Sequence, residues 1–218
     1  MANVFTSLDY NHERGLDKKL LQETGLICTG GIYHSNDLVS GKYKDVLFMQ
    51  ADVHIEEEHT EKDKDGHTET EIVTIFLGRY LIFTFPKKFD CKMVISFDGY
   101  YDNSYLIPKT KRGLNRIETE STDFNKRFLV YAEDGFEGFY ILNPAFIESL
   151  EKLGRQYDNK LSLYFSDNKL YVGLDDGGDA FEPPNPAVPI NEREEMAKVD
   201  KDMRLITDIV DNLKLNKK

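Results

Sequence analysis

The strongest hydrophobic pattern of this chain lies close to its C-terminus. Six apolar residues there recur at intervals of three and four positions: Met196, Val199, Met203, Ile206, Val210 and Leu213. This spacing places them along one side of a helix, which we predict over residues 191–215. The same spacing matches the a and d positions of a heptad, so the stripe either packs on the rest of the protein or meets another helix.

Upstream, apolar positions alternate with polar ones and predict strands. Residues 43–55 form one long strand in this interpretation, and a second runs from residue 72 to residue 85. Between them, residues 56–71 hold eight acidic residues, which we interpret as a solvated loop with a hairpin turn at Asp65-Gly66. Shorter strands are predicted at 26–33, 93–97 and 128–131, and a second hairpin at 161–174.

Helix signals gather in the C-terminal half. Asp134 is placed to cap a short helix that reaches residue 142, and Asn143-Pro144 opens a further helix that Gly154 would end. One more short helix is expected at 13–23. Strands joined mostly by short turns, with the helices collected late, indicate an α+β fold with a largely antiparallel sheet. We divide the chain into an N-terminal segment (1–25), one α+β domain (26–182), and a linker with the last helix (183–218).

The charge of the chain limits its partners. The formal net charge is −11, from 39 acidic and 28 basic residues, which argues against nucleic acid because phosphates need a basic surface. Lys109, Lys111, Arg112 and Arg116 form the only basic cluster, just after several tyrosines. This cluster is either a solvated loop or a site for an anion or a lipid headgroup.

Motifs for catalysis or for a bound group are missing from the sequence. There is no nucleophile elbow, no phosphate-binding glycine loop and no zinc pattern, so we predict no catalytic residue, no metal site and no cofactor. The acidic run from Asp175 to Asp179 is explained by turn chemistry, and a divalent cation is the alternative. Cys28 and Cys91 are expected to be reduced, buried thiols.

Residues 120–146 carry a pattern of polar and aromatic positions that are not interchangeable. It reads E-S-x-x-F-N-x-x-F-x-V, and it comprises Glu120, Ser121, Phe124, Asn125, Phe128 and Val130, followed by Tyr131, Asp134, Tyr140, Leu142, Pro144 and Phe146. In these residues the chain resembles the bacterial family catalogued as domain of unknown function 3137. The resemblance spans about residues 26–182 and implies no reaction. It implies membrane segments in many relatives, ahead of this domain.

Function follows from these observations only as an expectation. We expect a non-enzymatic binding or scaffold module, with a protein partner or self-association through the last helix. No apolar run approaches the ~20 residues that cross a bilayer, so we expect a soluble, cytoplasmic chain, or the cytoplasmic part of a membrane-tethered protein. The alternative is an enzyme of unrecognised type with a polar site near Asn125, Arg127 and Asp134. The basic cluster and these three residues are the candidate ligand or partner surface.

Overall fold

The protein is built on one antiparallel sheet, seen in a computed structural model that describes residues 5–27, 29–62, 68–97, 113–181 and 191–214. Within these residues the sheet has seven strands in the order β1-β2-β3-β4-β6-β5, with β7 paired to β4. The strands are β1 (Thr6–Asn11), β2 (Ile32–Tyr43), β3 (Val46–Lys62), β4 (Thr68–Phe97), β5 (Asn115–Ile117), β6 (Phe128–Ala132) and β7 (Leu161–Leu174). The helices are α1 (Lys18–Thr24), α2 (Thr122–Arg127), α3 (Gly135–Ile141), α4 (Pro144–Gln156) and α5 (Glu192–Asn212). The predicted α+β class with an antiparallel sheet is confirmed.

Strand β4 organises the sheet because it is 30 residues long and pairs with three others. One of its edges pairs with β3 as far as Thr84 and then with β6 from Met93 onward. Its other edge pairs with β7 from Arg79 to Ser96. The pairing with β7 shifts register between Thr84 and Met93, a stretch that contains Pro86, because proline has no amide hydrogen to give to a ladder.

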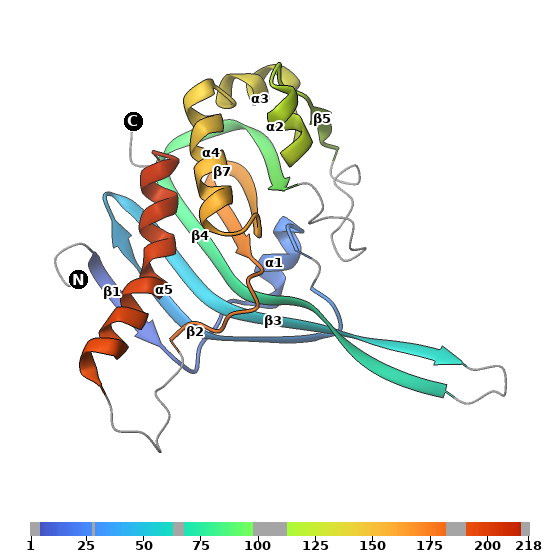
Figure 1. Ribbon diagram of the computed structural model, residues 1–218, viewed down its shortest axis with the longest axis vertical. Coiled ribbons are helices and arrows are strands. Elements are labelled where there is room, and N and C mark those ends of the chain that lie inside the picture. The colour runs from blue at the N-terminus through green and yellow to red at the C-terminus, as the bar shows by residue number, and fades with distance from the viewer. Residues whose placement is uncertain (1–4, 28, 63–67, 98–112, 182–190, 215–218) are drawn as a thin grey trace.

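Two apolar layers cover the two faces of this sheet. The period-two alternation of β4 puts Leu81 and Phe83 on one face and Tyr80 and Ile82 on the other. The first face carries the larger core, which α4 and α5 cover as they lie beside one another (Figure 1). The second face packs against Leu21 of α1 and the residues that follow that helix.

The predicted apolar stripe on helix α5 is buried toward the C-terminal end and exposed toward the N-terminal end. Met203, Ile206 and Val210 are buried against the sheet, and Leu213 also belongs to this core. Met196 and Val199, at the other end of the stripe, are 67% and 43% exposed. The same helix therefore provides core contacts in its second half and an apolar strip on the surface in its first half.

Polar contacts fix the second half of α5 in place. Asp208 accepts hydrogen bonds from the Tyr157 hydroxyl at 2.7 Å and from the Gln156 amide at 2.5 Å, which joins α5 to the end of α4. Burial and the Asp208 carboxylate both raise the pKa of Tyr157, so its hydroxyl stays protonated and remains a donor. Asp211 lies 2.8 Å from the Lys44 ammonium at the β2–β3 turn.

Several local expectations were wrong, each for a physical reason. Residues 56–71 were expected to be a loop, but β3 and β4 continue through them with a regular ladder up to the Lys62–Thr68 pair, and the turn lies outside the described residues. This acidic hairpin extends away from the body (Figure 1). Strand β1 was missed because its residues are largely exposed and it is ordered by pairing with β2.

Gly154 was expected to end the helix that begins at Pro144, but α4 continues to Gln156. A Cβ at position 154 would lie 2.3 Å from Cε1 of Phe97, so the glycine is needed for close packing and does not stop the helix. Cys91 is free and buried as expected, whereas Cys28 lies outside the described residues.

Candidate functional site

A groove of about 680 Å³ lies between the segment that precedes α2 and the helices α3 and α4. Its walls combine acidic and apolar side chains with two hydroxyl groups. They are Glu118, Thr119, Glu120, Ser121, Phe139, Leu142, Pro144, Ile147, Glu148 and Glu151. Four of these residues, Glu120, Ser121, Leu142 and Pro144, belong to the pattern by which the chain resembles its family.

The apolar part of the groove comes from the junction of α3 and α4. Asn143 caps α4 by accepting a hydrogen bond from the Phe146 amide at 3.1 Å, and Pro144 occupies the first turn, where its missing N–H costs nothing. At this junction Pro144 is exposed and Ile147 is partly buried, beside Phe139, which is 50% exposed. Phe136 and Tyr140, also on α3, are 80% and 78% exposed, so an aromatic surface continues outward from the groove.

Glutamates surround this apolar part. Glu118 lies 3.1 Å from the Arg116 guanidinium, and Glu151 is paired with Arg127. Among the residues that the structure describes, no ion pair involves Glu120 or Glu148, and both are exposed. The groove therefore presents an apolar floor with a net negative rim.

Asn125 was predicted as a site residue, and its side chain holds the chain segment at the groove wall. Its amide nitrogen donates to the Thr119 carbonyl at 2.7 Å, and its oxygen accepts from the Thr119 amide at 2.9 Å and from the Thr119 hydroxyl at 3.0 Å. These contacts satisfy backbone groups that no strand or helix serves. Asn125 thereby positions Thr119, which lines the groove.

Arg127 and Asp134, the other two residues of that prediction, lie outside the groove and contact the elements that form it. Arg127 hydrogen bonds to Glu151 of the rim. Asp134 caps α3 by accepting from the Phe136 amide at 2.8 Å, which fixes the helix that carries Phe139. None of the three predicted residues lines the groove: Asn125 and Arg127 bond to residues of its wall, and Asp134 caps the helix that carries Phe139.

The predicted basic cluster is described only at Arg116, which is engaged with Glu118. Lys109, Lys111 and Arg112 lie outside the described residues.

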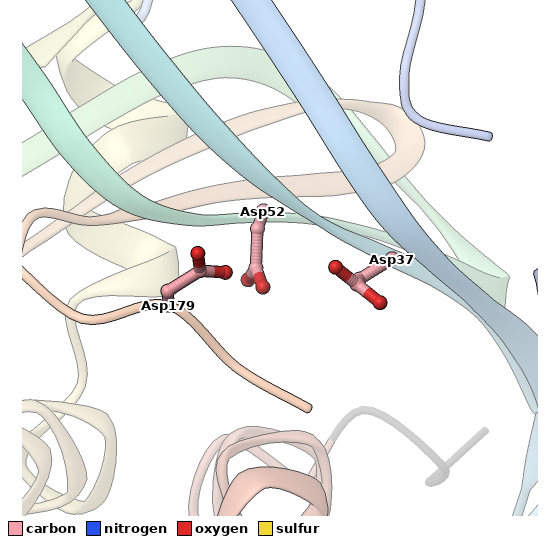
Figure 2. Close-up of side chains that lie close together, drawn as sticks. All are labelled: Asp37, Asp52 and Asp179. Atoms are coloured by element: carbon pink, nitrogen blue, oxygen red, sulfur yellow. The ribbon is translucent and has the colours of Figure 1, made fainter. Parts of the chain in front are cut away.

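A second constellation was not predicted as a unit: the carboxyl groups of Asp37, Asp52 and Asp179, whose oxygens lie within 4.8 Å of one another (Figure 2). Asp37 lies at the β2 bulge with a φ of 54°, and Asp52 continues the inward face of β3. Asp179 comes from the segment that follows β7. The alternation Val46, Phe48, Gln50, Asp52 is the one sequence signal for an inward carboxylate, because residues two apart on a strand share one face.

Hydrogen bonds orient two of these carboxyl groups. Asp37 accepts from the Tyr10 hydroxyl and from the Asn36 amide. Oδ2 of Asp52 accepts from the Ala180 amide at 2.7 Å. The backbone from Asp175 to Phe181 is thus tied across the sheet, 128 residues away from Asp52 along the chain.

Burial and neighbouring carboxyl groups shape the electrostatics here. Burial, a hydrogen bond with Asp179 and the charges of Asp179 and Asp37 together raise the pKa of Asp52 to about 9. Burial and the hydrogen bond to Asp37 raise the pKa of Tyr10 to about 12, which keeps its hydroxyl a donor. At neutral pH, Asp52 therefore carries a proton unless a cation replaces it.

The aspartates of the acidic run from Asp175 to Asp179 make contacts with different parts of the protein. Asp175 accepts from the Leu77 amide at 3.1 Å, and Asp176 lies 2.8 Å from the Arg79 guanidinium. Asp179 alone joins the three-carboxyl cluster. Turn chemistry is seen at Asp176, whose carboxylate also accepts from the Gly178 amide at 3.1 Å, whereas the contacts with Leu77 and Arg79 are long-range.

The geometry defines an α+β domain with an acid-rimmed apolar groove on its helical side and a carboxyl cluster on its sheet. The chain belongs to the family described as "Protein of unknown function (DUF3137)", whose model matches residues 74–215. This confirms the resemblance found in the sequence.

The chain was also compared with solved structures and with curated proteins. The crystal structure of the mycobacterial trehalose monomycolate transport factor A, TtfA, aligns with a TM-score of 0.43 at 10% sequence identity, covering 94% of this chain and 88% of that chain. A likeness at that level supports no statement on function. No curated protein matches the sequence significantly. In the described part of the chain, every helix is too short or too polar to cross a bilayer.

Proposed function

We propose that this domain is a non-enzymatic binding module, and that its groove holds a basic peptide segment with apolar side chains from a partner protein. The observation that carries the proposal is the combination of an apolar floor at Phe139, Leu142 and Ile147 with the glutamate rim. Exposed aromatic side chains and apolar grooves of this kind are typical of protein–protein contact surfaces.

Charge complementarity selects the partner. Glu120 and Glu148 have no cation paired with them among the described residues, so a Lys or Arg placed beside them would gain a new ion pair. Anionic lipids and nucleic acids would instead meet four glutamates, which repel them. The net charge of −11 favours the same class of partner over long range.

The cellular location of the domain is the second part of the proposed function. The family resemblance implies membrane segments ahead of this domain in many relatives, so we place the module at the cytoplasmic face of a membrane, as part of a tethered protein. Fractionation of cells that express the native gene tests this placement. Recovery of the native product in the cytosolic fraction alone, after a gentle lysis, would contradict it.

The binding proposal is tested with a fluorescein-labelled peptide of alternating lysine and leucine. Anisotropy titrations compare the wild type with the double variant Glu120→Lys/Glu148→Lys. A matched control, Glu192→Lys/Asp200→Lys, makes the same change of charge at exposed positions of α5. We expect the groove variant to weaken binding about tenfold, because two attractive contacts become repulsive, and the control to change it less than twofold.

NMR chemical-shift changes of the backbone amides during the peptide titration show where the peptide binds on the protein surface. The expected shifts lie in 118–121 and 139–151, and a peptide of alternating glutamate and leucine produces none of them. Equal losses in the groove and control variants would mean bulk attraction and would overturn the proposal. Shifts confined to other surfaces, or no binding by the wild type at millimolar peptide, would do so as well.

A further inference from the structure

The carboxyl cluster of Asp37, Asp52 and Asp179 lies apart from the proposed peptide groove and has a different chemistry. It joins three separate parts of the chain, namely the bulge of β2, the inward face of β3 and the segment between β7 and α5. Two of the three residues are buried, with Asp37 9% and Asp52 4% exposed, whereas Asp179 is exposed.

One atom of this cluster lacks a hydrogen-bond donor although it is buried. Oδ1 of Asp52 has no partner among the described residues, while Oδ2 of the same carboxyl accepts from the Ala180 amide. The Asp52 carboxyl lies between those of Asp37 and Asp179 (Figure 2). Since carboxylates accept and do not donate, Asp52 and Asp179 can meet only through a shared proton or through a cation.

The basic residue placed to neutralise Asp52 is used elsewhere. Arg79 is the cross-strand partner of Asp52 in the β3–β4 ladder, yet its guanidinium lies 2.8 Å from Asp176 and also reaches the Asp202 carbonyl of α5. In the ranges that the structure covers, no Lys or Arg forms an ion pair with Asp37, Asp52 or Asp179. The groups that face Asp52 from the neighbouring elements are therefore the carboxyl groups of Asp37 and Asp179. The Tyr10 hydroxyl donates to Asp37, and none of these groups is a cation.

We infer that Asp37, Asp52 and Asp179 bind a hard divalent cation, calcium above all, which fastens the segment after β7 to the sheet. All the ligand atoms are oxygens, the donors that calcium, magnesium and manganese prefer. Calcium binds oxygens at about 2.3–2.6 Å, so it tolerates oxygen pairs up to about 5 Å apart. The ligand oxygens lie within 4.8 Å of one another, a separation that calcium spans between oxygens on opposite sides of the ion, whereas magnesium, at about 2.0–2.1 Å, spans only about 4.2 Å.

The surroundings of the cluster suit a cation site. Tyr10 and Asn36 orient the Asp37 carboxylate, and the Ala180 amide orients Asp52, as the outer partners of metal ligands commonly do. The exposed Asp179 gives the ion a path from solvent. Water molecules complete the coordination on that side.

Binding has a structural consequence for the last helix. The segment from Asp175 leads to Phe181, whose amide donates to the Asp202 carboxylate of α5 at 3.2 Å and whose ring packs against that of Tyr10. A cation that holds Asp179 against the sheet therefore also stabilises the start of the buried half of α5.

Calorimetric titration of metal-free protein with CaCl₂, and separately with MgCl₂, tests the inference. We expect calcium to bind more tightly than magnesium, and to raise the melting temperature by about 3 °C or more at saturating concentration. Asp52→Asn and Asp179→Asn should each weaken calcium binding more than tenfold. The control Asp200→Asn, an exposed residue of α5, should leave it unchanged.

Hydrogen exchange of the Ala180 amide gives a second, independent measurement. Calcium should slow this exchange in the wild type and leave it unchanged in Asp179→Asn. Asp179→Asn keeps the experiment decisive if the buried variant does not fold, because position 179 is exposed. Absence of a calcium response in the wild type at 10 mM, or an unchanged response in Asp179→Asn, would overturn the inference. Its outcome is independent of the peptide titrations.

Discussion

Asp52 and Arg79 face each other across the ladder of β3 and β4, but their side chains do not form an ion pair with one another. Arg79 instead pairs with Asp176 at 2.8 Å, in the segment that crosses the sheet after β7. Its own exposure is 9%, so this ion pair is largely removed from solvent. The arrangement fastens the segment at Asp176 and leaves Asp52 to meet other carboxyl groups.

Replacing Arg79 tests how much this ion pair stabilises the fold. Arg79→Ala leaves Asp176 partly buried without a countercharge, and we expect a loss of about 2–3 kcal/mol in the free energy of unfolding by urea. The control Arg116→Ala removes an exposed ion pair with Glu118 and should cost less than about 0.5 kcal/mol. Similar losses in both variants would show that the Arg79 pair is worth no more than a surface contact.

The stability of the protein should depend on pH through Asp52. In the folded protein its pKa is raised from 3.8 to about 9, so the folded state holds more protons than the unfolded state between these values. Stability therefore falls as the pH rises through that window and levels off above it. In metal-free buffer we expect this carboxyl to contribute a slope of about −1.4 kcal/mol per pH unit.

Urea denaturation of the wild type and of Asp52→Asn between about pH 6 and pH 9 measures that contribution. The difference between the two proteins isolates Asp52 from the other titrating groups. We expect the variant to have the flatter profile and to gain on the wild type as the pH rises. Parallel profiles would mean that Asp52 is already ionised across this range.

Asn125 should stabilise the groove wall through its contacts with Thr119. Asn125→Ala removes the partners of the Thr119 amide and carbonyl, and we expect a cost of about 1–2 kcal/mol together with faster hydrogen exchange of the Thr119 amide. Asn125→Asp keeps the acceptor but loses the donor and should have an intermediate effect. Unchanged exchange at Thr119 in Asn125→Ala would remove its assigned role in holding this segment.

The two halves of α5 should respond differently to substitution. Ile206→Ala creates a cavity in the core and should lower the free energy of unfolding by urea by about 2–4 kcal/mol. Met196→Ala, at an exposed position, should lower it by less than about 0.5 kcal/mol. Light scattering tests self-association through this helix, the alternative that the heptad spacing allows. We expect Met196→Lys/Val199→Lys to abolish any association through this helix while leaving the unfolding midpoint unchanged.

Gly154 should resist substitution although it lies within a helix. Gly154→Ala gains helix propensity, but its Cβ would lie 2.3 Å from Cε1 of Phe97, and we expect a net loss of about 1–2 kcal/mol. Gly135→Ala is the matched control, because nothing lies within 4 Å of a Cβ there, and it should be neutral or stabilising. A stabilised Gly154→Ala would show that Phe97 moves aside at little cost.

Local signals in the sequence were sufficient for much of the fold. Asp134 and Asn143 cap α3 and α4 as predicted, because a cap needs only backbone amides two or three residues away. The last helix was predicted over 191–215 and found over Glu192–Asn212, since its stripe repeats with the helical period. Strand β1 carries no comparable signal, because its residues are exposed and gain order only by pairing with β2.

The candidate sites depended on contacts that local patterns do not encode. The residue pattern alone was sufficient for the α+β class, the caps, the α5 stripe and the family. The contact of Asn125 with Thr119, the burial of four of the six stripe residues, and the approach of Asp179 to Asp37 and Asp52 all depend on tertiary contacts. The reason is physical: local elements follow from residues a few positions apart, whereas the carboxyl cluster requires the β2–β3 register and a segment more than a hundred residues further along the chain.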